Sequence, residues 1–358
     1  MKKRVAVGVS GGVDSSVAAL RLKQEGYDVV GIFMKNWEDD DGCTAENDYA
    51  DVASVCNKIG IPYYTVNFSE EYYERVFEIF LTQYQKGRTP NPDVLCNSEI
   101  KFKAFLDYAL TVVKADFIAT GHYARKAEYN GKAALLRGLD ESKDQTYFLC
   151  GLNQYQLSKA LFPIGEMKKS AVRQIASEYA LRTADKKDST GICFIGEKKF
   201  RDFLANYLPN QPGLIRSVDG QVVGEHLGLM YYTLGQRRGL GIGGTGNGGR
   251  WYVAAKDLDQ NELIVVQDAV HPLLFSQAFY ATNVNFISGS PPAKAFECTL
   301  KYRHLQPDRK AKVAVQDDGN LYVEFFEPQR AVCPGQYAVF YDGAVCLGGA
   351  EIDKTVGV

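Results

Sequence analysis

No apolar run in the sequence approaches the roughly 20 residues that a membrane-spanning helix needs. The first residues, Met1 to Arg4, lead straight into a strand-like segment and leave no room for the apolar part of a signal peptide. We therefore expect a cytoplasmic protein without membrane contact.

The eight cysteines include no Cys-x-x-Cys pair. Such pairs supply many structural zinc sites, whereas disulfide frameworks are typical of small secreted domains. We expect neither in this chain, and we find no cluster of metal ligands in the sequence.

An excess of basic residues is also missing, because the formal net charge is −2. A nucleic-acid-binding domain usually carries a basic footprint. Any polyanionic partner must therefore be bound by local patches.

The length of 358 residues suffices for two or three domains, each with its own core.

The N-terminal segment combines a short strand, a glycine turn and the start of a helix. Val5 to Val9 is apolar and rich in valine, as in a buried strand, and polar residues then open a helical pattern. Free amides at a helix N-terminus and the helix dipole both favour phosphate. The predicted phosphate-binding residues are Gly8, Val9, Ser10, Gly11, Gly12, Val13, Asp14 and Ser15. The segment matches neither the Walker nor the dinucleotide-binding pattern, and a ligand-free turn is the simpler alternative for its two glycines.

Strand-like and helical segments alternate up to about residue 120, which favours an α/β fold with a doubly wound parallel sheet. The predicted strands are 5–9, 27–34, 63–68 and 116–120. Asn130-Gly131 predicts a β-hairpin. We divide the chain into a catalytic domain (1–208), a small central domain (209–272) and a C-terminal antiparallel β-barrel (273–358), whose strands are separated by Asp-Gly turns.

Two cysteines stand in segments that could carry chemistry. Residues 87–97, which we call the proline loop, place Asp93 three positions before Cys96, so both can share one face of a helical turn. Cys193 follows two lysines, whose charge would favour a thiolate. Taken alone, each cysteine is better explained as a buried, inert thiol.

Taken together, these motifs resemble known families. Ser10 to Ser15 is similar to the pyrophosphate loop of the N-type ATP pyrophosphatases, which cleave ATP between the α and β phosphates to adenylate a carbonyl oxygen. The proline loop, residues 119–123, 143–145, 188–196 and 234–237 occur in the order that is typical of bacterial tRNA-specific 2-thiouridylases. The resemblance covers essentially the whole chain.

The resemblance implies ATP, with Mg²⁺, as the cofactor, its phosphates on the pyrophosphate loop and its nucleoside near Met34 and Gly121. The C2 oxygen of the wobble uridine of a tRNA would be adenylated. Cys193 would carry a persulfide from a sulfur-relay protein to C2, and Cys96 would resolve it, leaving a Cys96–Cys193 disulfide. Asp93 would act as general acid and base.

The resemblance also implies residues that bind tRNA. Asn91, Pro92 and Asp93 would hold the flipped-out base. The other implied tRNA contacts are His122, Lys143, Asp144, Gln145, Lys301, Tyr302 and Gln336. From the residues alone we expect Lys301 and Arg303 on one strand face and Tyr302 on the other. We expect a monomer.

Two alternatives remain open at this point. An amidating ligase with the same ATP loop would need neither Cys96 nor Cys193. A noncatalytic protein that binds ATP and RNA would release no AMP.

Overall fold

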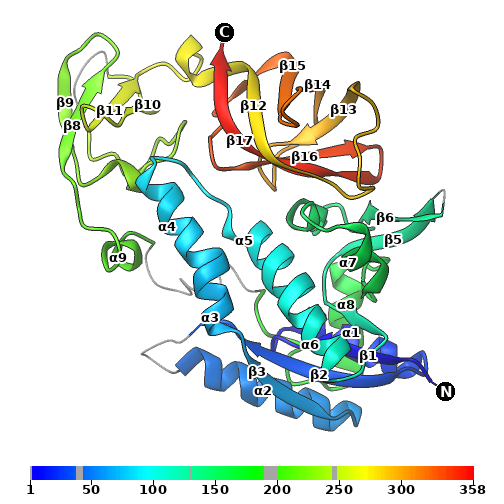
Figure 1. Ribbon diagram of the computed structural model, residues 1–358. Coiled ribbons are helices and arrows are strands. Elements are labelled where there is room, and N and C mark those ends of the chain that lie inside the picture. The colour runs from blue at the N-terminus through cyan, green and yellow to red at the C-terminus, as the bar shows by residue number, and fades with distance from the viewer. Residues whose placement is uncertain (1, 38–42, 130, 189–199, 244–247) are drawn as a thin grey trace.

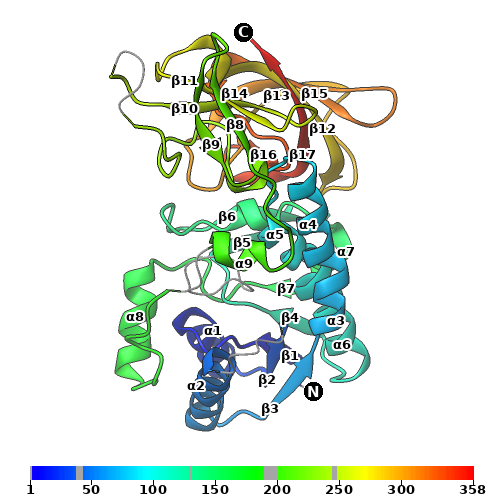
Figure 2. The same cartoon turned by 90° about the vertical axis from the view of Figure 1, so that its left-hand side faces the viewer.

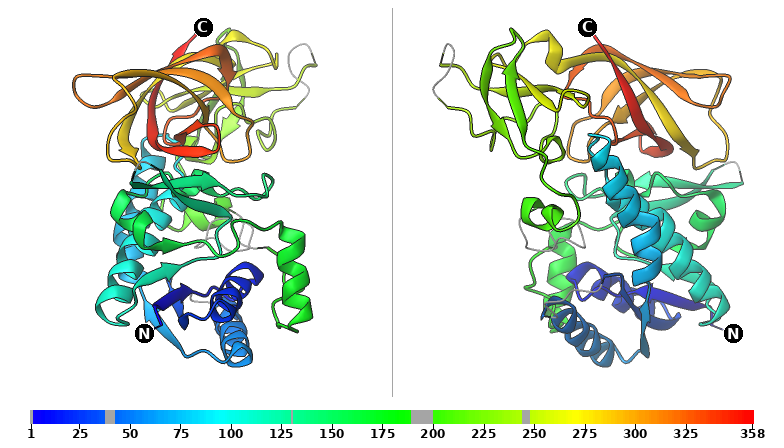
Figure 3. Two further views of the ribbon diagram at one scale, coloured as in Figure 1. Left: turned by 90° about the vertical axis from the view of Figure 1, so that its right-hand side faces the viewer. Right: turned by 60° about the vertical axis from the view of Figure 1, so that its left-hand side comes forward.

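The computed structural model describes residues 2–37, 43–129, 131–188, 200–243 and 248–358. Figure 1 shows an α/β domain at the bottom, with a barrel and a smaller sheet above it. Figure 3 shows that the smaller sheet and the barrel lie side by side on the α/β domain.

The α/β domain is built on a parallel five-stranded sheet of order β3-β2-β1-β4-β7. Its strands are β1 (Arg4–Gly8), β2 (Asp28–Lys35), β3 (Tyr63–Asn67), β4 (Phe117–Ala119) and β7 (Ala160–Leu161). The prediction of a parallel α/β sheet is confirmed. The sequence did not reveal β7, because two residues are too few for a recognisable pattern.

Helices cover both faces of this sheet. Val5 and Val7 pack in one core with Leu22 and Val52, which come from the helices α1 (Val13–Gln24) and α2 (Cys43–Ile59). Ala6 belongs to the core on the other face, which is rich in phenylalanine. That core is supplied by α3 (Ser69–Tyr72), η1 (Tyr73–Phe77), α4 (Glu78–Gln85), α5 (Pro92–Leu95), η2 (Cys96–Ala104) and α6 (Phe105–Thr111).

Two π-helical segments, η1 and η2, interrupt the α-helices on this face of the sheet. Helical backbone runs without a break from Pro92 to Thr111, and its π-helical part begins at Cys96. Such π segments widen the helix locally and occur frequently at functional sites.

The hairpin predicted at Asn130-Gly131 forms from β5 (Ala124–Tyr129) and β6 (Lys132–Arg137). Strand β6 also pairs with β17 (Val345–Gly357), so the α/β domain contributes to the sheet of the barrel. The remaining elements of this part are η3 (Thr146–Leu149), α7 (Gln154–Lys159), α8 (Lys169–Glu178) and α9 (Phe200–Ala205). Figure 2 shows α8 beside α1 at the edge of the domain.

The central part is a four-stranded sheet of order β10-β11-β8-β9. It comprises β8 (Gly213–Ser217), β9 (Val222–His226), η4 (Leu229–Tyr231), β10 (Tyr252–Asp257) and β11 (Glu262–Val266).

The C-terminal part is a closed antiparallel barrel, as predicted. Six strands follow in the order β12-β15-β14-β13-β16-β17, and pairing between β12 and β17 closes the ring. After η5 (Pro272–Leu274) these are β12 (Phe275–Phe286), β13 (Ala295–Lys301), β14 (Arg309–Val315), β15 (Leu321–Arg330), β16 (Tyr337–Asp342) and β17. Gly319 and Gly343 form the predicted Asp-Gly turns with positive φ. The exact domain boundaries stay predictions.

Among the residues that the structure describes, no helix is both long enough and apolar enough to cross a lipid bilayer.

Candidate active site

The predicted phosphate loop, residues 8–15, connects β1 to α1 and is held largely by its own side chains. Gly11 has φ +74°, and a Cβ there would lie 2.7 Å from the Asp48 carbonyl oxygen. The Ser15 hydroxyl accepts a hydrogen bond from the Ser10 amide at 3.1 Å and donates to the Gly12 carbonyl at 3.1 Å. Only a residue without a side chain fits at position 11, because the loop packs closely against α2 there.

Gly121 and Met34 lie against this loop from neighbouring strands. A Cβ on Gly121 would be 2.6 Å from the backbone nitrogen of Ser15. A Cβ on Gly8 would touch the Met34 methyl group at 3.0 Å. Both predicted nucleoside-contacting residues therefore stand at the carboxyl edge of the parallel sheet, where ligands bind in α/β folds.

The proline loop ends in the helix that begins at Pro92. Asn91 is the extended N-cap residue, Pro92 occupies the first helical position, and the Asn97 side chain donates to the Asp93 carbonyl at 2.9 Å. Cys96 is the fifth residue of this helix, one turn on from Asp93, and is only 1% exposed. Proline at the first helical position costs no hydrogen bond, because that amide has no partner within the helix.

One cavity of about 560 Å³ brings these segments together. Its lining includes Ser10 to Ser15 of the phosphate loop (except Gly11), and Asp93 and Cys96 from the proline loop. Asn91 and Pro92, which were predicted to hold the target base, precede Asp93 but are not among the lining residues.

Several ionisable groups in the cavity have displaced pKa values, among them Asp93 and His122. Burial raises the pKa of Asp93 above its ordinary 3.8, although the positive charges of Lys101 and His304 oppose this. Burial, assisted by Lys101, lowers the pKa of His122 well below 6.5. His122 also shares a hydrogen bond of 2.7 Å between its Nδ1 and the Thr120 hydroxyl. Asp93 is thus biased towards the proton-carrying form, as suits a general acid, and His122 is neutral.

Of the predicted tRNA contacts in the turn 143–145, Lys143 and Gln145 line the cavity and Asp144 does not. Asp144 is buried, and its carboxylate accepts hydrogen bonds from the Gly138 amide and from Thr146. Its side chain thereby fixes the turn that presents the two neighbouring residues. His122 lines the cavity as well.

The barrel residues differ from their expected arrangement. Strand β13 ends at Lys301, so the expectation that Arg303 shares a strand face with Lys301 is wrong. The Arg303 guanidinium instead donates to the Leu234 and Ala331 carbonyl oxygens. Tyr302 is 3% exposed in the barrel core, where its hydroxyl donates to the Arg330 carbonyl at 3.3 Å. Its predicted contact with tRNA stays a prediction, and burial leaves its ring little surface for a base.

Gln336 contacts the proline loop from the barrel. Its side-chain nitrogen lies 2.7 Å from the Thr89 carbonyl oxygen, and the Thr89 amide donates to the Pro334 carbonyl at 2.9 Å. Arg88 forms ion pairs with Glu351 and Asp353 of β17. From the central sheet, the Lys256 ammonium donates to the Gly87 carbonyl at 2.8 Å, and burial lowers the pKa of Lys256 from 10.5 to about 8. The proline loop is therefore held by all three parts of the chain.

Cys193 lies outside the described residues, so its role and its pairing with Cys96 stay predictions. Asp188, the last described residue before it, lines the cavity.

Sequence reasoning missed several cavity residues. Lys101 stands in the π-helical segment, Lys169 begins α8, and His304 follows β13. Lysines on helices are usually solvated, so no local pattern distinguished Lys101 and Lys169 from surface residues. His304 follows a strand and likewise carries no local signal.

Comparison with known proteins agrees with this architecture. Residues 3–197 match the tRNA methyl transferase HUP domain family, residues 201–267 the tRNA methyl transferase PRC-barrel domain and residues 276–352 the aminomethyltransferase beta-barrel domain. Among solved structures, the U34-tRNA thiolase of Methanococcus maripaludis aligns at a TM-score of 0.36 and 19% identity, covering 57% of this chain and 65% of that one, which adds nothing to the assignment.

Curated relatives match over nearly the whole length. A tRNA-specific 2-thiouridylase of Geobacillus kaustophilus is 62% identical over 99% of this chain and 96% of its own. Enzymes of the same name from Alkaliphilus oremlandii and Bacillus cytotoxicus are 58% and 57% identical, each over 98% of this chain and over 97% and 95% of their own length. The chain belongs to the tRNA-specific 2-thiouridylase family.

Proposed function

We propose that this protein is a sulfurtransferase that uses ATP to replace the C2 oxygen of the wobble uridine of tRNA with sulfur. Membership of the family supports the reaction class. The observation that carries the proposal is the single cavity that is lined both by the phosphate loop and by Asp93 and Cys96. Because one cavity holds both sets of residues, the uridine can be adenylated at its C2 oxygen and receive sulfur at C2 within reach of Cys96.

The local structure fits the phosphates of ATP. The first turn of α1 offers amides without partners within the helix, and no side chain at Gly11 or Gly12 blocks the approach to them. Bound ATP, with Mg²⁺, would supply the adenylate that turns the C2 oxygen into a leaving group. Met34 and Gly121 would border the nucleoside.

The cysteines and Asp93 then have separate tasks in the proposal. The terminal sulfur of a persulfide on Cys193 attacks C2, and the oxygen departs with AMP. The Cys96 thiol attacks the inner sulfur, which leaves sulfur on C2 and a Cys96–Cys193 disulfide for a cellular thiol to reduce. Asp93, with its raised pKa, exchanges the proton with the reacting oxygen or sulfur.

The target base must leave its stack to enter the cavity. We assign the positioning of the base to Asn91, Pro92 and Asp93. His122, Lys143 and Gln145 would contact the tRNA at the cavity, and Lys301 would contact it outside the cavity. We propose that Asp144 and Gln336 act through the segments they hold. A sulfur-relay protein supplies the persulfide, the enzyme works as a monomer, and the reaction takes place in the cytoplasm.

The test combines the protein with tRNA, ATP labelled at the α phosphate, and a persulfide donor, which supplies the outer sulfur of the Cys193 persulfide at the required oxidation level. We expect labelled AMP in equal amount to new 2-thiouridine, measured by mass analysis of tRNA nucleosides. AMP without thiouridine would indicate a ligase that uses another nucleophile, and the absence of AMP would leave only a binding protein. The Cys193→Ser variant is expected to abolish thiolation and to retain tRNA binding.

A further inference from the structure

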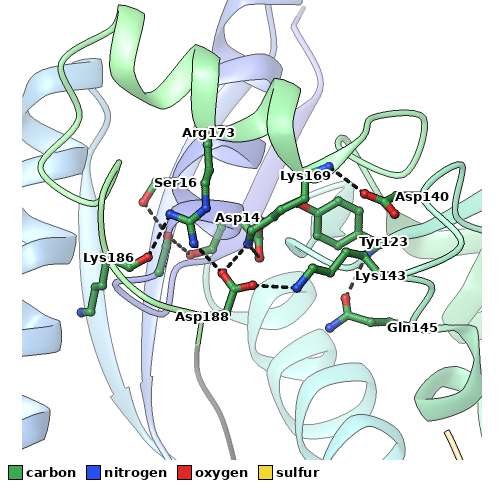
Figure 4. A network of polar contacts seen from close by, with 12 residues as sticks. Asp14, Ser16, Tyr123, Asp140, Lys143, Gln145, Lys169, Arg173, Lys186 and Asp188 are labelled. Atoms are coloured by element: carbon green, nitrogen blue, oxygen red, sulfur yellow. Dashed lines mark hydrogen bonds and ion pairs between the residues drawn. The ribbon is translucent and has the colours of Figure 1, made fainter. Parts of the chain in front are cut away.

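A group of charged side chains beside the phosphate loop joins four segments of the chain. Figure 4 shows Asp188 between Lys143, Lys169 and Arg173, with Asp14 close by. The Asp188 carboxylate lies 2.8 Å from the Lys143 ammonium, 2.7 Å from the Lys169 ammonium and 2.8 Å from the Arg173 guanidinium. All three of these partners are cations.

Lys169 connects this group to the phosphate loop. Its ammonium lies 2.8 Å from both oxygens of Asp14, and its side chain is only 12% exposed. Asp14 also accepts a hydrogen bond from the Tyr123 hydroxyl at 2.8 Å. Val172 and Ala176 of α8 pack in one core with Val17 of α1, which fixes the lysine above the first turn of α1.

The surroundings favour a larger anion than one carboxylate. Lys143, Lys169 and Lys187 line the cavity, and the N-terminus of α1 adds amides without partners within the helix. Lys186 also lines it but is ion-paired with Asp48 and Asp51. Burial opposes the ionisation of Asp188, but hydrogen bonds from Lys143 and Lys169 outweigh it and lower the pKa of this carboxyl from 3.8 to about 2. Asp188 is therefore a permanent anion that occupies positions suited to phosphate oxygens.

We propose that Lys169 and Arg173 form the subsite for the β and γ phosphates of ATP, with Lys143, which the proposed function assigns to tRNA, at its border, and that Asp188 is the internal counterion which these phosphates displace. The proposal rests on the proposed function, because it assigns the polyphosphate of the same ATP. A triphosphate carries more charge and more acceptor oxygens than one carboxylate, so it competes successfully for the three cations. When pyrophosphate leaves, Asp188 regains them, which favours product release.

The test uses calorimetry on the full-length protein to measure three dissociation constants. These are for pyrophosphate in the presence of a chelator, for Mg-ATP, and for AMP. Lys169→Met removes the charge and keeps most of the apolar stem. Asp188→Asn removes the carboxylate charge that would compete with phosphate and leaves the three cations in place. Lys168→Met is the matched control, because Lys168 is the exposed neighbour and makes no side-chain cap.

We expect Lys169→Met to bind pyrophosphate at least 10-fold more weakly than the wild type, and Asp188→Asn to bind it about 5-fold more tightly. AMP affinity should be unchanged in both variants, and Lys168→Met should behave like the wild type.

Three outcomes would overturn the inference. Weaker pyrophosphate binding by Asp188→Asn would mean that Asp188 organises the cations without competing. If Asp188→Asn weakened the binding of Mg-ATP but not that of pyrophosphate, Asp188 would be a magnesium ligand. Unchanged binding by Lys169→Met would place the phosphates elsewhere. Failure of the wild type to bind ATP would instead contradict the proposed function itself. Should Lys169→Met fail to fold, the Asp188→Asn result still decides.

Discussion

The phosphate loop and the proline loop form two sides of one cavity, yet they are held in different ways. The phosphate loop keeps its shape through contacts within the α/β domain, namely the bonds of Ser15 to Ser10 and Gly12 and those of Lys169 and Tyr123 to Asp14. The proline loop is bound to distant segments: Gly87 to the central sheet, and Arg88 and Thr89 to the barrel. ATP binding can thus be a property of the α/β domain, whereas the position of Asp93 depends on all three parts of the chain.

This difference gives the two smaller parts a role besides any contact with tRNA. They fix the segment from which the helix bearing Asp93 and Cys96 begins. Changes in the barrel should therefore alter sulfur transfer without altering ATP affinity. Changes in the phosphate loop should lower ATP affinity and, through the loss of adenylation, sulfur transfer as well.

The largest effect is expected for Asp93→Ala, on the proline-loop side. Loss of a general acid and base typically slows a reaction by roughly 100-fold to 10,000-fold. Thiolation should fall by that factor, measured as thiouridine formed in single-turnover reactions, while ATP affinity stays within about twofold because the phosphate loop is separate. A large loss of tRNA affinity with a normal turnover rate would show that Asp93 only positions the base.

Next in size is Gly121→Val, on the phosphate-loop side. The new Cβ would lie 2.6 Å from the Ser15 nitrogen, so the loop must move. We expect ATP affinity to fall about 100-fold, or about 2.7 kcal/mol, by calorimetry. Gly357→Ala is the control, because a Cβ there meets no atom within 4 Å. Normal ATP affinity in the valine variant would contradict the idea of a rigid loop.

Arg88→Met tests the connection between the proline loop and the barrel. It removes the ion pairs to Glu351 and Asp353 and leaves Glu351, which is 6% exposed, with a hydrogen bond from Asn283. We expect thiolation to fall about 10-fold, the equivalent of about 1.4 kcal/mol in activation free energy. ATP affinity should remain at the wild-type value. Equal losses of both would mean that the variant disturbs the whole domain, which a thermal melt would reveal.

The smallest effect concerns stability and pH. Because burial raises the pKa of Asp93 above 3.8, its ionised form destabilises the folded state. This loss of stability is absent when the pH is below the pKa of Asp93 in the unfolded chain. It is complete when the pH is above the pKa of Asp93 in the folded protein. Asp93→Asn should therefore melt a few degrees higher than the wild type at pH 7, since each kcal/mol corresponds to about 2–4 °C. The difference should vanish as the pH falls towards 3. A constant difference at all pH values would exclude ionisation as its cause.

The sequence by itself determined the parts whose signals are local. The alternation of strand and helix predicted the parallel sheet, Asn130-Gly131 predicted the hairpin, and Asp-Gly turns predicted the barrel strands, because short-range backbone preferences and periodicity are written in consecutive residues. The phosphate loop belongs to this class. Its residues carry both the turn and the helix start.

Only the tertiary structure decided which distant residues share the cavity. Lys169 and His304 come from segments 135 residues apart by number (304 − 169), and each looks like an ordinary surface residue in its own segment. The burial of Tyr302 follows from closure of the barrel. Gln336 contacts the proline loop through a hydrogen bond to Thr89, which lies 247 residues away in the sequence. Such contacts depend on how cores pack and sheets close, which no local pattern encodes.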